Sequence, residues 1–248
     1  MSAAELAATL MRQYARTPLL VILLVVVPPL FITLSYYTTA PADLTVFVRS
    51  GGERVALSIA QPEVHLAIMP PITAAFLSGV AGLFVMLEAS RADQRLVVAG
   101  VPAARVAVAR LLMIAVMAVA VAGLSVPTAL INLRPGDSLA FLAANVLVAI
   151  AYGFIGALIS LVVGRLGGAY LMFFIPMMDV GIFQDPMFIS GDQPLWMQLL
   201  PGFGGTRFAI DAAFSGSGDD WVALGAASAW VVLLAAATMA VFVRRSRG

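Results

Sequence analysis

The side chains that most enzymes use for catalysis are scarce in this chain of 248 residues. It has no cysteine, one histidine (His65) and no lysine, since all 14 basic residues are arginine. Thiol nucleophiles, two-histidine zinc motifs, Schiff bases and a P-loop, whose lysine reaches the nucleotide phosphates, are therefore excluded. We expect a chain that is not an enzyme, with no catalytic residue, no metal site and no cofactor of its own.

Two groups of polar residues resemble fragments of active sites. Gly216-Ser217-Gly218 has the form of a nucleophile turn, but His65 is its only candidate base, and we interpret the segment as a loop. Asp179, Asp185 and Asp192 are close in sequence, yet no histidine joins them. An ionisable residue inside a membrane span is a functional candidate, so Asp179 is predicted either to face a substrate path or to accept hydrogen bonds at a helix end.

The most charged stretch of the chain, Glu88–Arg110, holds the other functional candidates. Its charges alternate in sign, and we expect it on the cytoplasmic side between two spans. A short helix over Ala92–Ala99 would show Asp93, Arg95 and Leu96 to the cytosol and fit the groove of a soluble partner. The alternative is a solvated loop whose arginines only set the topology. The candidate coupling residues are Glu88, Arg91, Asp93, Arg95 and Leu96.

Membrane-spanning helices must position these candidates. Hydrophobic residues make up 62% of the chain and charged residues 11%, against about 45–50% and about 25% in soluble domains. The net charge of +1 gives no reason to expect nucleic acid as a partner. A span needs about 20 apolar residues, so we predict an all-α integral membrane protein with one transmembrane domain over residues 1–248. Its six spans run approximately over residues 18–38, 66–87, 106–131, 139–163, 169–183 and 221–243.

Further elements are expected around these spans. Ser2–Arg16 is predicted to form an interfacial helix or to extend the first span. Residues 184–220 are too apolar for a loop and too broken to span, which indicates short helices that lie at the interface or re-enter the membrane. Leu44–Val48 alternates weakly and is either a strand or an extended run. Small residues spaced by four predict close helix contacts in the second and fourth spans, within one subunit or between two.

The arginines indicate the orientation. Six spans place both termini on one side, and that side holds ten of the 14 arginines. The positive-inside rule then places both termini in the cytoplasm. The four arginines on the other side are Arg49, Arg54, Arg134 and Arg207.

The order of several motifs is characteristic. An N-terminal helix leads directly into the first span. The second span ends at Glu88 and is followed by Asp93-Gln-Arg95-Leu96 and Gly100-Val-Pro102-Ala-Ala-Arg105. The stretch before the last span contains Ile175-Pro176, Gly181-Ile-Phe, Pro186, Pro194-Leu-Trp196, Leu200-Pro201 and Arg207-Phe-Ala-Ile-Asp211. Over nearly its whole length the chain therefore resembles the ABC-2 type permeases, the membrane subunits of bacterial ABC exporters for drugs, antibiotics and polysaccharides. It departs from drug exporters in the short loop after its first span.

The resemblance implies a half-transporter in the bacterial inner membrane. Two permease subunits, identical or paralogous, would form the pore, and each would dock on a separate ABC ATPase that binds ATP and Mg²⁺. Residues 88–105 would form the coupling segment, and the cargo would be a drug, an antibiotic, a lipid or another amphiphile. The absence of lysine agrees with this expectation, because a transporter without a P-loop must take its energy from a partner.

Other classes of protein remain as alternatives. A secondary transporter or channel would use buried charges as ion relays and would show inverted repeats. Five spans contain no charge at their centres, and the two halves of the chain do not correspond. An intramembrane hydrolase is disfavoured by the single histidine and the lack of cysteine. A structural or assembly protein is the fourth possibility.

Overall fold

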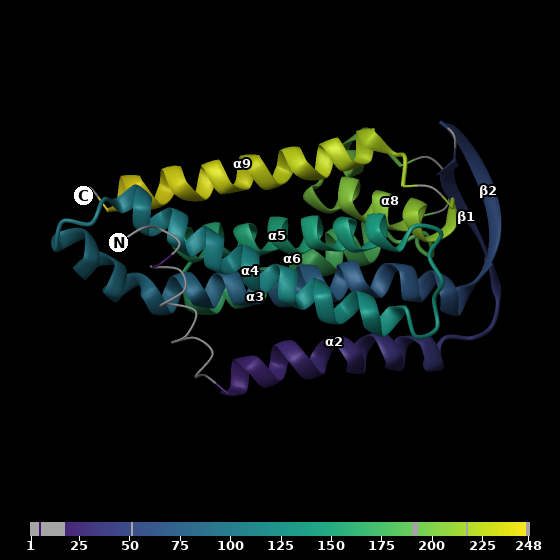
Figure 1. The fold of residues 1–248 in the computed structure, drawn as a ribbon, viewed down its shortest axis with the longest axis horizontal. Helices are drawn as coiled ribbons and strands as arrows, with labels where there is room; N and C mark the ends of the chain where they lie inside the picture. The colour runs from purple at the N-terminus through teal and green to yellow at the C-terminus, as the bar shows by residue number, and fades with distance from the viewer. Residues whose placement is uncertain (1–4, 6–17, 51, 190–192, 217, 247–248) are drawn as a thin grey trace.

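A β-hairpin covers one end of a long bundle of helices in the computed structural model (Figure 1). The structure describes residues 5, 18–50, 52–189, 193–216 and 218–246. The interfacial helix expected over Ser2–Arg16 therefore lies outside the described residues, apart from Glu5. The elements are α2 (Pro18–Thr38), β1 (Asp43–Ser50), β2 (Glu53–Ala60), α3 (Gln61–Val98), α4 (Ala103–Ala129), α5 (Ser138–Val162), α6 (Arg165–Met178), the π-helix η1 (Asp179–Phe183), α7 (Leu195–Gln198), α8 (Pro201–Phe214) and α9 (Trp221–Arg245).

Among the residues that the structure describes, five helices are long and apolar enough to cross a membrane, as a multi-pass membrane protein requires. The qualifying stretches are Gln61–Ala89, Ala103–Ala129, Ser138–Val162, Arg165–Phe183 and Trp221–Arg245. They coincide with the last five predicted spans. The first predicted span forms α2. The apolar stretch of α2 among the described residues is Leu24–Thr38, which is shorter than the stretches of the other five helices.

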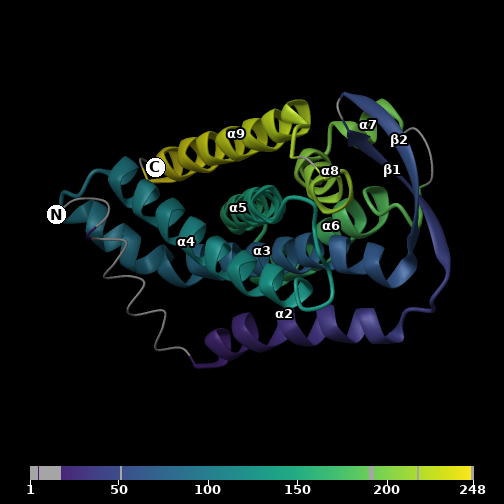
Figure 2. The same cartoon turned by 45° about the vertical axis from the view of Figure 1, so that its right-hand side comes forward.

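Helix α5 is the centre of the bundle. Figure 2 shows it nearly end-on, with α3, α4, α8 and α9 around it. Helix α2 lies outside this group and packs on α3 and α4. The largest apolar core contains Tyr152, Met113, Leu83 and Met172, which come from four different helices and are almost fully buried. This core holds α3, α4, α5 and α6 as one unit.

Glycines let α3 and α5 approach within backbone contact. A Cβ atom on Gly82 would lie 2.0 Å from the carbonyl oxygen of Gly153, and one on Gly156 would lie 1.9 Å from that of Gly79. No larger residue fits at these positions without moving a helix. Two of the predicted small-residue positions therefore make close helix contacts inside one chain: Gly82 lies against Gly153, and Gly156 lies against Gly79.

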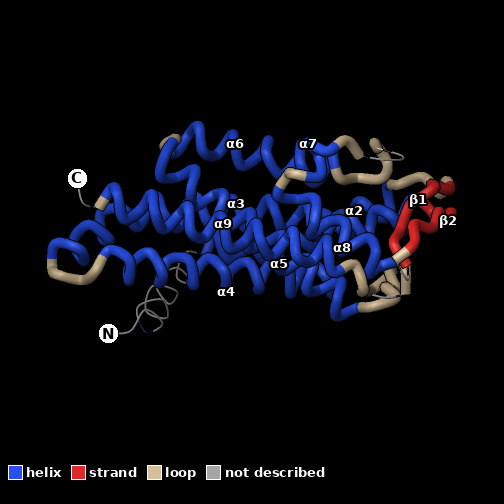
Figure 3. The backbone as a smooth tube through the Cα atoms, turned by 90° about the horizontal axis from the view of Figure 1, so that it is seen from above, coloured by secondary structure: helices blue, strands red, loops and turns tan. Residues whose placement is uncertain are grey.

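The hairpin adds two short strands to an otherwise helical fold. Strands β1 and β2 pair antiparallel from Asp43↔Ala60 to Ser50↔Glu53, around a tight turn in which Gly52 has a φ of 84°. Alternate side chains point inward, so Val46 and Val48 pack against α3 and α8. Leu44–Val48 is thus a strand. Figure 3 shows the hairpin at the same end of the bundle as the loop before α7.

The chain between η1 and α9 forms the short helices predicted for residues 184–220. Helix α7 has four residues and α8 has 14. Helix α8 packs closely on its neighbours because three of its residues are glycine. A Cβ on Gly204 would lie 2.6 Å from the carbonyl oxygen of Ala223 in α9, and one on Gly205 would lie 2.3 Å from a methyl group of Val148 in α5.

Candidate coupling hairpin and polar sites

Helix α3 continues well beyond its apolar part. Its span-like stretch ends at Ala89, but the helix runs to Val98. The prediction of a separate short helix over Ala92–Ala99 is therefore wrong, because nothing between residues 88 and 98 breaks the helix. A tight turn with Gly100 at a φ of 91° leads into α4. We call residues 90–110 the coupling hairpin; Figure 1 shows its turn at the end of the bundle opposite the β-hairpin.

A buried ion pair joins the two arms of the coupling hairpin. The Arg110 Nη2 atom lies 2.7 Å from Asp93 Oδ1, and Arg110 Nε donates to both carboxylate oxygens. Asp93 is 2% exposed and Arg110 is 4% exposed. The expectation that Asp93 faces the cytosol is therefore wrong, because α3 turns this side chain toward α4.

The other predicted coupling residues differ in their exposure. Glu88 and Arg95 are exposed, and Leu96 is half-buried against the main core. The side chain of Arg91 lies outside the described residues, although its backbone is part of α3. Arg95 within the coupling hairpin and Glu88 just before it are thus accessible at the surface. Removing one member of a buried, charge-assisted pair is costly, so the pair holds the two arms of the hairpin together.

Asp179 accepts three hydrogen bonds from three elements. The donors are the Tyr152 hydroxyl on α5, the Gly202 backbone N–H at 2.8 Å and the Gln184 side-chain amide at 3.1 Å. Gly202 belongs to the first turn of α8, whose free N–H groups attract a carboxylate. Asp179 is 4% exposed, and it lines neither of the two cavities described below. Its geometry is that of a helix-end residue that fixes α8 to α5 and η1.

A second polar cluster connects the β-hairpin to α8 and α9. The Arg49 backbone N–H donates to Asp211 at 2.9 Å, and the Arg49 guanidinium lies 3.5 Å from Asp220. Arg207 lies 3.3 Å from Asp211, one turn along α8. Burial raises the pKa of the Asp211 carboxyl to about 6, although Arg207 and the Arg49 N–H favour its charged form. The cluster fixes the turn end of the hairpin against the helices.

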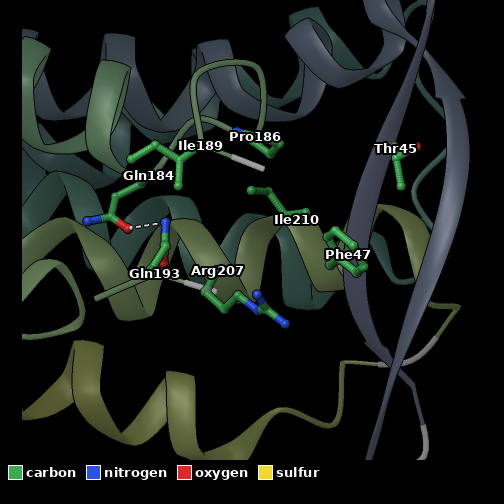
Figure 4. Close-up of a pocket in the computed structure, with 8 residues that line it drawn as sticks. All are labelled: Thr45, Phe47, Gln184, Pro186, Ile189, Gln193, Arg207 and Ile210. Atoms are coloured by element: carbon green, nitrogen blue, oxygen red, sulfur yellow. Dashed lines mark hydrogen bonds between the residues drawn. The ribbon is translucent and has the colours of Figure 1, made fainter. Parts of the chain in front are cut away.

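Two cavities adjoin this cluster. The smaller, of about 40 Å³, lies between β1, α8 and the loop before α7, and its lining includes Thr45, Ile189 and Ile210 (Figure 4). It holds a few water molecules at most. The larger, of about 620 Å³, lies between the hairpin, residues 193–203 and the start of α9. Arg207 lines both cavities, and Figure 4 shows its guanidinium directed away from Gln193.

The described members of the fragments that resemble active sites have other partners. The His65 ring shares a hydrogen bond with the Thr39 hydroxyl. Asp185 is buried and accepts a hydrogen bond from the Met187 N–H at 2.8 Å; burial raises its pKa to about 6. Ser217 and Asp192 lie outside the described residues. Among the side chains that the structure describes, no three carboxylates or imidazoles are grouped to hold a metal ion.

Several residues of these sites were not predicted. Arg110 was counted only as a topological arginine, although a charge inside the apolar run of α4 was a sign that it has a partner. Tyr152 and Gln184 carry no sequence signal that links them to Asp179. Comparison with known proteins adds no further assignment: no protein-family model matches the chain, and no curated protein matches it significantly.

Proposed function

We propose that this chain is the permease subunit of an ABC-2 type exporter. Two such subunits, identical or paralogous, form the pore, and each is driven by a separate ABC ATPase. The observation that carries the proposal is the coupling hairpin: α3 extends nine residues past its apolar stretch, from Ser90 to Val98, and is tied to α4 by the buried Asp93–Arg110 pair. A rigid helical projection of this kind suits a soluble partner that pushes on it.

The charge distribution supports the corresponding orientation. Arg95, Arg105, Arg165, Arg244 and Arg245 all lie on segments at the end of the bundle that carries the coupling hairpin. The β-hairpin end carries Arg49, Arg54, Arg134 and Arg207. With α2 as the sixth span, the positive-inside rule assigns the coupling hairpin and both termini to the cytoplasm of a bacterial cell. The β-hairpin and α8 then lie at the outer face of the inner membrane.

The proposed mechanism follows from how the elements are joined. ATP binding and hydrolysis take place on the partner, which moves the coupling hairpin through Glu88 and Arg95. Helices α3 and α4 move together because Asp93 and Arg110 connect them, and α5 follows because its glycines interlock with those of α3. Helix α8 is held to α5 through Asp179 and Tyr152, so the movement reaches the opposite end of the bundle.

The experiment that tests this function is isolation of the chain from its native membrane. A tagged chain purified in mild detergent should carry with it a subunit that contains a P-loop. The isolated complex should hydrolyse ATP, and inverted membrane vesicles should accumulate an amphiphilic dye when ATP is added. Dye transport that needs a proton gradient but no ATP would contradict the proposal and favour a secondary transporter.

A further inference from the structure

The larger cavity lies where α9 enters its span-like stretch. Val222, Ala223 and Ala226 of α9 form part of the cavity wall, and the stretch of α9 that is apolar enough to cross a membrane begins at Trp221. The volume of about 620 Å³ falls within the range of about 300–1,000 Å³ of pockets that hold drug-sized ligands. Lipid headgroups lie at the ends of spanning helices, so a lipid can reach this cavity without leaving the bilayer.

The apolar part of the wall is not covered by the protein. Leu195, Leu199 and Val222 line the cavity and are 78%, 72% and 74% exposed. Their chain neighbours Trp196 and Trp221 are exposed as well, and tryptophan is enriched at the boundary between the apolar and polar layers of a membrane. Acyl chains can therefore pack on this part of the wall while a headgroup meets the polar part.

Arg207 supplies hydrogen-bond donors to the polar part of the wall. Its Nε atom lies 3.3 Å from the fully buried carboxylate of Asp211. The two terminal nitrogens of the same guanidinium have no hydrogen-bond partner among the residues that the structure describes, and the side chain is 26% exposed. Guanidinium N–H groups bind phosphate oxygens well. Arg207 can thus hold a phosphate while it keeps its contact with Asp211.

Two glutamines supply acceptors to the same part of the wall. The Gln193 amide nitrogen donates to the Phe183 carbonyl and to Gln184, and the Gln198 amide nitrogen donates to the Gln193 carbonyl. The amide oxygens of Gln193 and Gln198 accept no hydrogen bond from the part of the chain that the structure describes. A ligand that only accepts hydrogen bonds leaves these two oxygens without a donor.

The charges along the polar wall occur in pairs. Arg49 lies 3.5 Å from Asp220, as Arg207 does 3.3 Å from Asp211. Arg54 also lines the cavity, but it contacts the Phe47 ring and interacts with further groups, so we assign it no ligand. A wall that carries both signs of charge, free N–H donors and free amide oxygens is complementary to a zwitterion.

We propose that this cavity binds a zwitterionic phospholipid whose headgroup carries a primary ammonium. Arg207 donates to the phosphate oxygens, the ammonium donates to the amide oxygens of Gln193 and Gln198, and the acyl chains pack on Leu199 and Val222. An ammonium group has three N–H donors, which is enough for both amide oxygens. The inference goes beyond the proposed function, because it requires only that α9 lies in a membrane.

The test is a native mass-spectrometry titration of the full chain, in a neutral detergent, with dioleoylphosphatidylethanolamine. We expect one saturable lipid adduct. Each methyl group added to the ammonium replaces an N–H donor, so the affinity should fall step by step along the methylated series. Dioleoylphosphatidylcholine, which has no N–H donor, should bind about tenfold more weakly than dioleoylphosphatidylethanolamine.

Variants of the polar wall separate the two headgroup contacts. Gln198→Leu should lower the affinity for phosphatidylethanolamine to that for phosphatidylcholine. Gln198→Glu loses the same hydrogen bond to the Gln193 carbonyl but keeps an acceptor, so it should retain the preference. Arg207→Lys should weaken both lipids alike, since both carry a phosphate. Gln94→Leu is the matched control, because Gln94 is exposed near the opposite end of the bundle, and it should bind both lipids as the parent does.

Several results would overturn the proposal. Equal affinities of the parent for phosphatidylethanolamine and phosphatidylcholine would indicate unselective lipid contact. Phosphatidylglycerol that binds as tightly as phosphatidylethanolamine would indicate an anion site. Equal effects of Gln198→Leu and Gln94→Leu, or unchanged binding of both lipids by Arg207→Lys, would contradict the assigned contacts. The measurement needs no ATPase, so a negative result leaves the proposed function standing.

Discussion

Asp93 and Arg110 form an ion pair whose two side chains are 3% and 5% exposed, with the closest nitrogen and oxygen 2.7 Å apart. They are 17 residues apart in the chain and lie on opposite arms of the coupling hairpin. The pair accounts for how a projection at the end of α3 can remain rigid. Because Asp93 is buried, its side chain contacts Arg110 and not the surface of the hairpin.

Replacing Asp93 by alanine should destabilise the protein by about 3–5 kcal/mol, because Arg110 would stay buried without its counter-charge. The free energy of unfolding in detergent measures this loss. Arg95→Ala is the control, since an exposed residue should change stability by no more than about 0.5 kcal/mol. Equal stability of the two variants would show that Arg110 finds another partner. The exchanged pair Asp93→Arg with Arg110→Asp should recover part of the loss.

Enlarging Gly156 should disrupt the contact between α3 and α5. An alanine there would place its Cβ 1.9 Å from the Gly79 carbonyl oxygen, and overpacking of this kind costs about 1–3 kcal/mol or more. Gly123→Ala in α4 is the matched control, since no atom lies within 4 Å of its added Cβ. The midpoint of thermal unfolding should fall for the first variant and hold or rise for the second. A similar midpoint for both would mean that the two helices can separate without cost.

Tyr152→Phe should weaken the attachment of α8. The variant keeps the ring but removes the hydroxyl that donates to Asp179, and a buried acceptor that loses a donor costs about 1–3 kcal/mol. Protease cleavage within residues 184–220 should become faster. Asp179→Asn distinguishes the two roles predicted for this residue: loss of stability fits a helix-end role, whereas loss of transport at unchanged stability would assign Asp179 to the substrate path.

Stability should depend on pH through Asp211. Burial raises the pKa of its carboxyl from the ordinary value of 3.8 to about 6, so between these values the folded protein holds a proton that the unfolded chain has released. The free energy of unfolding therefore falls as pH rises from about 4 to about 6. Asp211→Asn should reduce this fall by roughly 2–3 kcal/mol, measured as unfolding curves at several pH values. An unchanged slope in the variant would rule out this contribution.

The helices could be predicted from the sequence because hydropathy and length decide which segments cross a membrane. Each predicted span coincides with a helix of the structure, within a few residues at most ends. The predicted end of α3 was wrong. Charged residues indicate where a helix leaves the apolar layer of the membrane, but they do not end the helix. Residues 88–98 contain no proline or glycine that would break the helix.

The contacts within the sites were much less predictable. Asp93 and Arg95 have similar sequence surroundings, yet one is buried and the other exposed, because exposure depends on which face of α3 meets α4. The three donors to Asp179 come from residues 152, 184 and 202, which the sequence gives no means of connecting. The cavity at the β-hairpin likewise depends on how three distant segments meet.

Site-specific cross-linking tests the central claim, that a separate ATPase docks on the coupling hairpin. A photoreactive phenylalanine analogue replaces Arg95 in one variant and Arg134 in another, since both side chains are exposed but lie at opposite ends of the bundle. We predict that, in native membranes, position 95 cross-links to a P-loop ATPase and position 134 does not. An ATPase captured at position 134, or none captured at position 95, would contradict the proposed coupling.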